Sequence, residues 1–288
     1  MCRMFLFSSK HASTSSKILN QVNPIINSWI KSTELDPLFI EPGETQQHDH
    51  GYGSYQCFSS EPKKENILLS KSWKPAFEDR PYIKLNGESV SQYFLLNHAR
   101  KASKSMPISI NQNHPFVNES GTLILAHNGT LSKKILISLL KHEDIFPENL
   151  SDTQILFTIL KDRFEDKNSD NIEELYNNWK ELITVIKQIH ENQKKDYSMN
   201  LLFLVKNIEN NSFTLFFTSS YSELDKEKYF KLYLFENSNF EVFSSSTIKD
   251  YLEKEFSDDY KTWNIKTIDN NSIGFFNLVS NNYFVEQL

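Results

Sequence analysis

The chain has 288 residues, of which 39% are hydrophobic and 13% aromatic, and such a composition needs a large buried core and excludes a disordered protein. The 31 Lys and Arg against 37 Asp and Glu give a net charge of -6, which argues against a nucleic-acid-binding surface. With only Cys2 and Cys57, a disulfide framework is excluded, and a reducing compartment is indicated. The apolar start Met4-Phe5-Leu6-Phe7 is shorter than a signal-peptide core, and no run is long enough to span a bilayer. We therefore expect a cytoplasmic protein that has no membrane segment.

The first half of the chain predicts a buried strand, a helix and then several short strands. Residues Cys2 to Phe7 are apolar on both alternating faces, as in a strand buried on both sides. Apolar residues from Ile18 to Trp29 recur at helical spacing, and we expect Pro24 to kink or shorten that helix. The short strands are rich in β-forming residues and cover Tyr52 to Phe58, Ile67 to Leu69, Tyr93 to Asn97 and Thr122 to Ala126.

The second half predicts a helical block followed by more strands. The helices run from Leu131 to Lys141, from a Ser151 cap through Phe164, and from Asn171 to about Lys194, with a short one near Ile248 to Phe256. The strands cover Met199 to Lys206, Ser212 to Ser219, Tyr229 to Phe235, Phe240 to Ser244, Ile273 to Val279 and Tyr283 to Val285. Because strands and helices do not alternate as βαβ units, we expect an antiparallel α+β fold in a single domain of residues 2–288.

Cys2 is the first candidate for chemistry. Methionine removal acts where the second residue is small, and it would leave the thiol and a free α-amine on the same residue. An α-amine has an unperturbed pKa of ~7.7 to 8.0, close enough to neutrality to accept the thiol proton. The alternative is that Cys2 is a small buried hydrophobic residue, which is also our interpretation of Cys57.

The run from Leu123 to Leu131 predicts a buried strand that ends in a polar turn at His127-Asn128-Gly129. The Asn128 side-chain amide and the Gly129 backbone N–H are two donors that could stabilise a developing oxyanion, and a glycine permits close approach of a substrate. Alternatively, Asn-Gly is simply a common hairpin turn.

Two charged residues could bind the ends of an amino-acid substrate. The Arg100 guanidinium suits bidentate capture of a carboxylate, or else a structural ion pair. Asp152 follows the helix cap Ser151. An acidic residue there is favoured by the helix dipole, which is a complete structural explanation, and the alternative is that its carboxylate holds a substrate ammonium group. The His48-Asp49-His50 cluster could suggest a metal site, but its position before Gly51 favours local turn chemistry, so we predict no metal and no cofactor.

Six segments, in this order, resemble the class II glutamine amidotransferases of the N-terminal nucleophile hydrolase superfamily. They are Met1-Cys2-Arg3, His48-Asp49-His50-Gly51-Tyr52-Gly53, His98-Ala99-Arg100, Asn113-His114-Pro115-Phe116, His127-Asn128-Gly129 and Ser151-Asp152-Thr153. The opening Met-Cys-Arg is similar to a stand-alone subgroup that includes γ-glutamyl amidohydrolases of glutathione breakdown and of ergothioneine synthesis. Segments Met199 to Leu202, Val242 to Ser245 and Trp263 to Ser272 extend the resemblance over nearly the whole chain.

The resemblance implies a four-layer αββα sandwich and a role for each motif. Cys2 would be both nucleophile and base, Asn128 and Gly129 the oxyanion hole, Arg100 the site for the substrate α-carboxylate, and Asp152 the site for its α-ammonium. His98 and His127 invite comparison with a Cys-His protease, but the family implies supporting hydrogen bonds around the substrate instead. The chain differs from the family pattern at Tyr52, Ser54 and Ala99. The resemblance places these positions beside the nucleophile, so the differences bear on how the substrate fits there.

The expected reaction is hydrolysis of glutamine through a γ-glutamyl thioester on Cys2, which releases glutamate and ammonia. The partners expected are this small γ-glutamyl substrate and a synthase or peptidase subunit, and no nucleic acid. Two alternatives remain open at this stage: hydrolysis of a γ-glutamyl peptide, and a catalytically inactive scaffold subunit.

Overall fold

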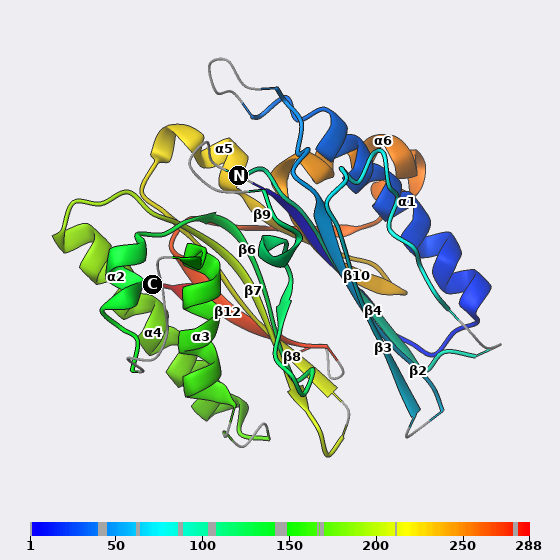
Figure 1. Ribbon diagram of the computed structural model, residues 1–288. Coiled ribbons are helices and arrows are strands. Elements are labelled where there is room, and N and C mark those ends of the chain that lie inside the picture. Colours follow the sequence, from blue (N-terminus) through cyan, green and yellow to red (C-terminus); the bar gives the residue numbers. More distant parts are fainter. Residues whose placement is uncertain are drawn as a thin grey trace. The chain divides into compact units, whose positions relative to one another are not determined.

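The computed structural model describes residues 2–39, 45–61, 64–85, 89–102, 108–141, 149–165, 167, 170–210, 212–278 and 282–288. The chain forms two compact units, the first from Met1–Pro115 and Lys228–Ile268 and the second from Phe116–Glu227 and Asp269–Leu288. Each unit contains one antiparallel sheet together with helices, so the predicted α+β class is confirmed (Figure 1). The predicted single domain stays a prediction.

The first unit contains a seven-stranded sheet in the order β11-β9-β10-β1-β4-β2-β3. Helices α1 and α6 pack on one face of this sheet (Figure 1). The strands are β1 (Arg3–Ser9), β2 (Tyr52–Glu61), β3 (Lys64–Ser72), β4 (Gln92–Ala99), β9 (Leu232–Glu236), β10 (Phe240–Ser245) and β11 (Asn264–Ile268), and the helices are α1 (Ser15–Glu34) and α6 (Ser246–Tyr260).

Alternation along β1 assigns its side chains to two faces of the sheet. Phe5 and Phe7 belong to the core under α1 and α6, where Phe5 meets Trp29 with ring centroids 5.8 Å apart. Opposite residues of paired strands share a face, and Met4 lies opposite His98. The alternation therefore places Cys2, Met4 and His98 on the face away from the helices.

The second unit contains a six-stranded sheet in the order β13-β12-β8-β7-β6-β5. Its strands are β5 (Phe116–Val117), β6 (Leu123–Thr130), β7 (Ser198–Asn207), β8 (Ser212–Tyr221), β12 (Ser272–Asn277) and β13 (Tyr283–Gln287). Its helices are α2 (Lys133–Ile137), α3 (Asp152–Phe164) and α4 (Ile172–Asn192), and the short α5 (Glu227–Phe230) lies where the chain passes back to the first unit.

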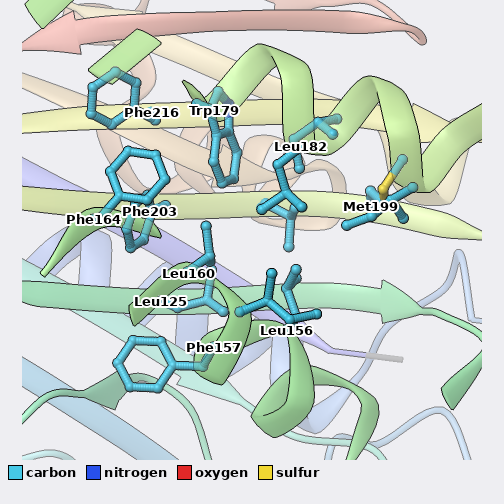
Figure 2. Packing of buried hydrophobic residues seen from close by; sticks show 14 of the residues in the cluster. Leu125, Leu156, Phe157, Leu160, Phe164, Trp179, Leu182, Met199, Phe203 and Phe216 are labelled. Carbon is cyan, nitrogen blue, oxygen red and sulfur yellow. The ribbon is translucent and has the colours of Figure 1, made fainter. Parts of the chain in front are cut away.

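The core of the second unit fills the space between its sheet and helices α3 and α4 (Figure 2). Trp179 of α4 stacks on Phe203 of β7 with ring centroids 5.5 Å apart, and Phe164 of α3 meets the same ring edge-on at 5.0 Å. This packing confirms that the apolar stripe of the predicted long helix is a core face.

The structure corrects several predicted boundaries. Helix α1 runs through Pro24 for 20 residues, so this proline does not shorten it. The predicted strand from Tyr229 begins instead with α5, and its strand part is β9. The helix predicted from Leu131 is the five-residue α2, and β11 has no counterpart among the predicted strands. Val279, the predicted end of a strand, lies outside the described residues.

Strand β6 extends further than the sequence predicts. The predicted strand end at Ala126 is wrong, because β6 continues through His127, Asn128 and Gly129 to Thr130. Asn128 lies opposite Asn200 and Gly129 opposite Met199 of β7, so the dipeptide belongs to the sheet rather than to a turn. Among the residues described, no helix is long and apolar enough to cross a membrane.

Candidate active site

Cys2 precedes β1, a central strand of the first sheet, and its side chain is 7% exposed. Burial raises the pKa of the Cys2 thiol, but the charge of His98, the amino-terminal charge and hydrogen bonds with the His98 side chain and the Lys101 backbone lower that pKa to about 6. Such a thiol is mostly thiolate at neutral pH, which is the nucleophilic form of cysteine. The protein therefore favours the reactive state of this residue.

A second histidine is bonded to His98. The Nδ1 atom of His114 lies 2.9 Å from Nε2 of His98, and the ring centroids are 4.2 Å apart. Both side chains are buried, His98 completely. Cys2, His98 and His114 thus form a continuous polar group inside the first unit.

The segment from Ile110 to His114 covers the end of β4. Its Gln112 accepts a hydrogen bond from Arg100 at 2.9 Å, and its Asn113 donates one to the Ser72 carbonyl at 2.8 Å. Gly53 lies opposite His98 in the sheet, and a methyl group on it would overlap the His114 carbonyl oxygen. This glycine is what lets the segment approach the strand so closely.

Gly51 precedes β2 in a left-handed conformation, with a φ of 90°. A side chain there would be strained, and it would also collide with the Ser72 carbonyl and the Asn113 amide. The Gly51 carbonyl accepts the Arg100 backbone N–H at 2.9 Å. The glycine therefore fixes the backbone from which Arg100 extends.

Arg3, the residue after Cys2, points to the helix-covered face and lies in a buried polar network. Its guanidinium contacts Asp36 at 2.6 Å and Thr247 at 2.7 Å, and its carbonyl accepts the Trp29 indole N–H at 3.1 Å. Asp36 also contacts the His48 ring at 2.8 Å, and all three side chains are fully buried. The network anchors the backbone next to the candidate nucleophile.

In the second unit, Asn128 lies on the face of its sheet that is away from α3 and α4. The neighbouring Leu123 and Leu125 pack under those helices, so the alternation turns Asn128 and its partner Asn200 to the other side. Gly129 is required by the sheet itself, because a methyl group on it would overlap the Ser198 carbonyl oxygen. The sequence analysis explained this glycine by close approach of a substrate, and strand pairing is a second reason for it.

Asp152 joins the end of β6 to the start of α3. Its carboxylate accepts the backbone N–H of Leu131 and that of Thr153, each at 2.8 Å. Ser151 caps α3, as predicted, with a reciprocal bond pair to Gln154. His127 bridges the same region, since it contacts the Thr153 hydroxyl at 2.8 Å and donates through Nε2 to the Ser198 carbonyl at 3.0 Å.

Within the His48-Asp49-His50 cluster, the Asp49 carboxylate and the His50 ring lie 3.4 Å apart, and each of the three residues also has a partner outside the cluster. His48 contacts Asp36, Asp49 accepts a bond from Lys101 at 3.0 Å, and His50 accepts the Ala102 backbone N–H at 2.8 Å. In the described part of the chain, no group of three or more His, Cys, Asp or Glu side chains is placed to hold a metal ion. Cys57 is buried and donates to Glu65 at 2.8 Å.

The three positions that depart from the family pattern lie on the helix-covered face. Tyr52 and Ala99 belong to the core under α1 and α6, and they lie opposite each other in the register that also pairs Ser54 with Asn97. Cys2 and His98 occupy the other face. These three side chains therefore lie on the opposite face of the sheet from Cys2, whereas the sequence analysis associated them with substrate fit beside the nucleophile.

The structure brings Cys2, His98 and Arg100 together at one strand end of the first unit, and His127, Asn128, Gly129 and Asp152 together at one strand end of the second. Sequence reasoning missed the direct bonds of His114 and Gln112 to this set. The motif Asn113-His114-Pro115-Phe116 was the signal that could have indicated them.

Neither a family model nor a curated protein sequence matches this chain. Among solved structures, the chain is similar to the 2.0 Å crystal structure of a predicted glutamine amidotransferase from Pseudomonas aeruginosa PA01. That similarity has a TM-score of 0.34 and 16% sequence identity, and it covers 85% of this chain and 83% of the other.

Proposed function

We propose that the chain is a γ-glutamyl amide hydrolase of the class II glutamine amidotransferase kind, with Cys2 as its nucleophile. The observation that carries this proposal is the buried Cys2 next to a central strand, where the charge and hydrogen bond of His98 help to lower the thiol pKa to about 6 despite burial. A buried structural cysteine has its thiol pKa raised, and a lowered value is typical of a catalytic one.

The proposed reaction begins with attack of the Cys2 sulfur on the δ-carbonyl carbon of glutamine. The Asn128 amide and the Gly129 N–H stabilise the resulting oxyanion, and collapse of the intermediate expels ammonia and leaves a γ-glutamyl thioester. Water then attacks the thioester and releases glutamate. The α-amine that removal of Met1 exposes on Cys2 is the base that the family resemblance implies.

Arg100 and Asp152 are proposed to bind the α-carboxylate and α-ammonium groups of the substrate. The Arg100 guanidinium is buried and oriented by Gln112, which suits recognition of a carboxylate. The bonds of Asp152 to two backbone N–H groups keep this carboxylate in a fixed orientation. Positioning of this kind supplies part of the ~7 to 11 kcal/mol available from orientation of reactants.

The fold proposed for this activity is the four-layer αββα sandwich of N-terminal nucleophile hydrolases. Two observations support it. Each unit has helices on one face of its sheet, and in each the face away from the helices carries a proposed catalytic residue, Cys2 in one and Asn128 in the other. A partner synthase that accepts the ammonia belongs to the same proposal.

The proposal is tested with the two cysteines, which are both buried and each hydrogen-bonded. Cys2→Ala should abolish release of glutamate from glutamine and from γ-glutamyl peptides, while Cys57→Ala should leave turnover nearly unchanged. Thermal unfolding of both variants, followed by circular dichroism, serves as the control for folding. Equal losses from both substitutions would contradict the role of Cys2, and turnover of γ-glutamyl peptides without any glutaminase activity would make the chain a peptide amidohydrolase. Absence of turnover on every γ-glutamyl amide would favour the scaffold alternative.

A further inference from the structure

Asn200 has no role in the mechanism proposed above, although it lies directly opposite Asn128 in the register of β6 and β7. Directly opposite residues share a face of the sheet with their Cβ atoms about 4.5–5.5 Å apart, so the two side-chain amides are within reach of each other. Asn128 is completely buried and Asn200 is 1% exposed. Burial of an amide is costly unless the amide is hydrogen-bonded, so two buried amides that face each other need a physical reason.

The two asparagines belong to a polar row that crosses the second sheet on the face away from its helices. Asn200 lies opposite Ser219 of β8, and Ser219 lies opposite Ser272 of β12, all of them buried. The neighbouring row on the same face of β6, β7 and β8 is apolar and consists of Ala126, Leu202 and Phe217. The general character of this face therefore does not account for a polar row at the level of Asn128.

Three residues of β7 face Asn128, one directly and two diagonally. Leu202 has no polar side-chain group, and the Ser198 hydroxyl already accepts the Thr130 backbone N–H at 2.9 Å. On its other side, β6 pairs with β5 only at residues that precede Asn128. Within the described part of the second sheet, Asn200 is therefore the residue best placed to orient the Asn128 amide.

An asparagine amide has two orientations, which differ by exchange of its oxygen and nitrogen atoms. Only the orientation that directs the Asn128 N–H toward the substrate stabilises an oxyanion, because a carbonyl oxygen in its place would repel the developing charge. We propose that Asn200 is the positioning residue that selects this orientation, by donating a hydrogen bond from its Nδ2 to the Oδ1 of Asn128. This role rests on the proposed function, in which Asn128 is an oxyanion-hole donor.

The experiment is a double-mutant cycle in steady-state kinetics, with glutamine or γ-glutamylcysteine as substrate, whichever the parent hydrolyses faster. Asn200→Ala should lower kcat about tenfold, the loss expected for one hydrogen bond, and should change KM less than about twofold. Because Asn200 acts through Asn128, the double variant should be no slower than Asn128→Ala alone, whose kcat we expect ~100-fold below that of the parent. Independent contributions would instead multiply to a loss of ~1,000-fold.

A second variant separates orientation of the amide from packing. Asn200→Leu nearly preserves the shape of the side chain but removes its donor and its acceptor. It should lower kcat about as far as Asn200→Ala does, although it leaves no cavity. A role of Asn200 in packing alone predicts that the leucine variant keeps the parent kcat.

The matched control is Asn207→Ala at the other end of β7. Asn207 is also buried, and its Oδ1 accepts the Glu209 backbone N–H at 2.9 Å, so this variant should lose stability in thermal unfolding without losing kcat. A parent-like kcat in Asn200→Leu, or a double variant with the multiplied loss, would overturn the role of Asn200 while the proposed function stands. If the parent hydrolyses neither substrate, the proposed function fails and the role of Asn200 fails with it.

Discussion

Arg3, Asp36 and His48 form a buried polar network beside the proposed nucleophile. Burial raises the pKa of the Asp36 carboxyl, but the Arg3 guanidinium and the His48 hydrogen bond outweigh it and hold this pKa below its usual range. Removing one partner of such a pair leaves a buried charge uncompensated, which typically costs ~3–5 kcal/mol. Because Arg3 is covalently next to Cys2, the network couples the position of the sulfur to the stability of the fold.

The network predicts a loss of stability in acid. Burial lowers the pKa of His48 to about 4, with the Arg3 charge acting in the same direction. The unfolded chain, whose histidine pKa is ~6.5, binds the proton more readily, so the stability contributed above that pH is lost as pH falls from ~6.5 toward 4.

The prediction is checked by urea unfolding of the parent protein and of His48→Gln between pH 7 and pH 4. The parent free energy of unfolding should fall over this range, and the variant should show a smaller slope because it lacks the titrating ring. Equal slopes in the two proteins would show that other groups cause the acid sensitivity.

Separate roles for binding and chemistry are predicted for three polar residues. Asn128→Ala should lower kcat ~100-fold or more if the amide stabilises the oxyanion, whereas Arg100→Lys should mainly raise KM. Asp152→Asn keeps one acceptor oxygen for the Leu131 N–H and loses the bond from the Thr153 N–H, so it should also raise KM, while the Ser151 cap still holds the start of α3. Steady-state kinetics with glutamine distinguishes the two patterns, and an unchanged kcat for Asn128→Ala would leave this residue with a role in the sheet alone.

Helix α3 is positioned by its first turn. The Ser151 hydroxyl accepts the Gln154 N–H at 3.1 Å, and the Gln154 side chain accepts the Ser151 N–H at 2.8 Å. Substituting a bonded cap by alanine costs ~0.5–2 kcal/mol. We predict this loss for Ser151→Ala by denaturant unfolding.

Ser132 supplies the matched control, because it occupies the cap position of α2 but its side chain makes no cap hydrogen bond. Ser132→Ala should therefore change the free energy of unfolding by less than ~0.5 kcal/mol. If the two substitutions have the same effect, the reciprocal bonds at Ser151 do not stabilise α3.

Hydrophobic periodicity predicted most elements correctly, because the stripes of α3 and α4 and the apolar runs of β1, β7 and β8 are set by local sequence. It failed where long-range contacts decide the outcome. The end of β6 was misplaced because Asn-Gly has strong turn preference, yet pairing with β7 keeps both residues in the sheet. Helix α1 continues through Pro24, where burial of residues on both sides of the proline stabilises it.

The candidate site could be predicted only in part for the same reason. Cys2, Arg100 and Asp152 carry chemistry that is visible in their residue type. The bonds of His114 to His98 and of Gln112 to Arg100 depend on a segment folding back over two strands, which no local pattern records. Nor could composition show that Arg3 and Cys2, adjacent in sequence, serve opposite faces of a sheet.

At the level of the whole chain, the glutamyl half of the substrate is the part that the proposed residues recognise. Specificity for the leaving group must then come from elsewhere, and the family resemblance implicates Asp49 to Tyr55 and Ala99 to Met106, a range whose last residues lie outside the described ones. We expect weak glutaminase activity from the isolated chain and a strong increase when a partner closes this side.

The proposed mechanism passes through a covalent γ-glutamyl thioester on Cys2. The most direct measurement mixes glutamine with protein that begins at Cys2, quenches the reaction in acid and determines the intact mass and the modified peptide. We expect an added glutamyl group on the N-terminal peptide, and we expect it to be absent both from Cys2→Ala and from protein that retains Met1. Turnover of glutamine without this adduct, or with equal speed when Met1 is retained, would contradict it.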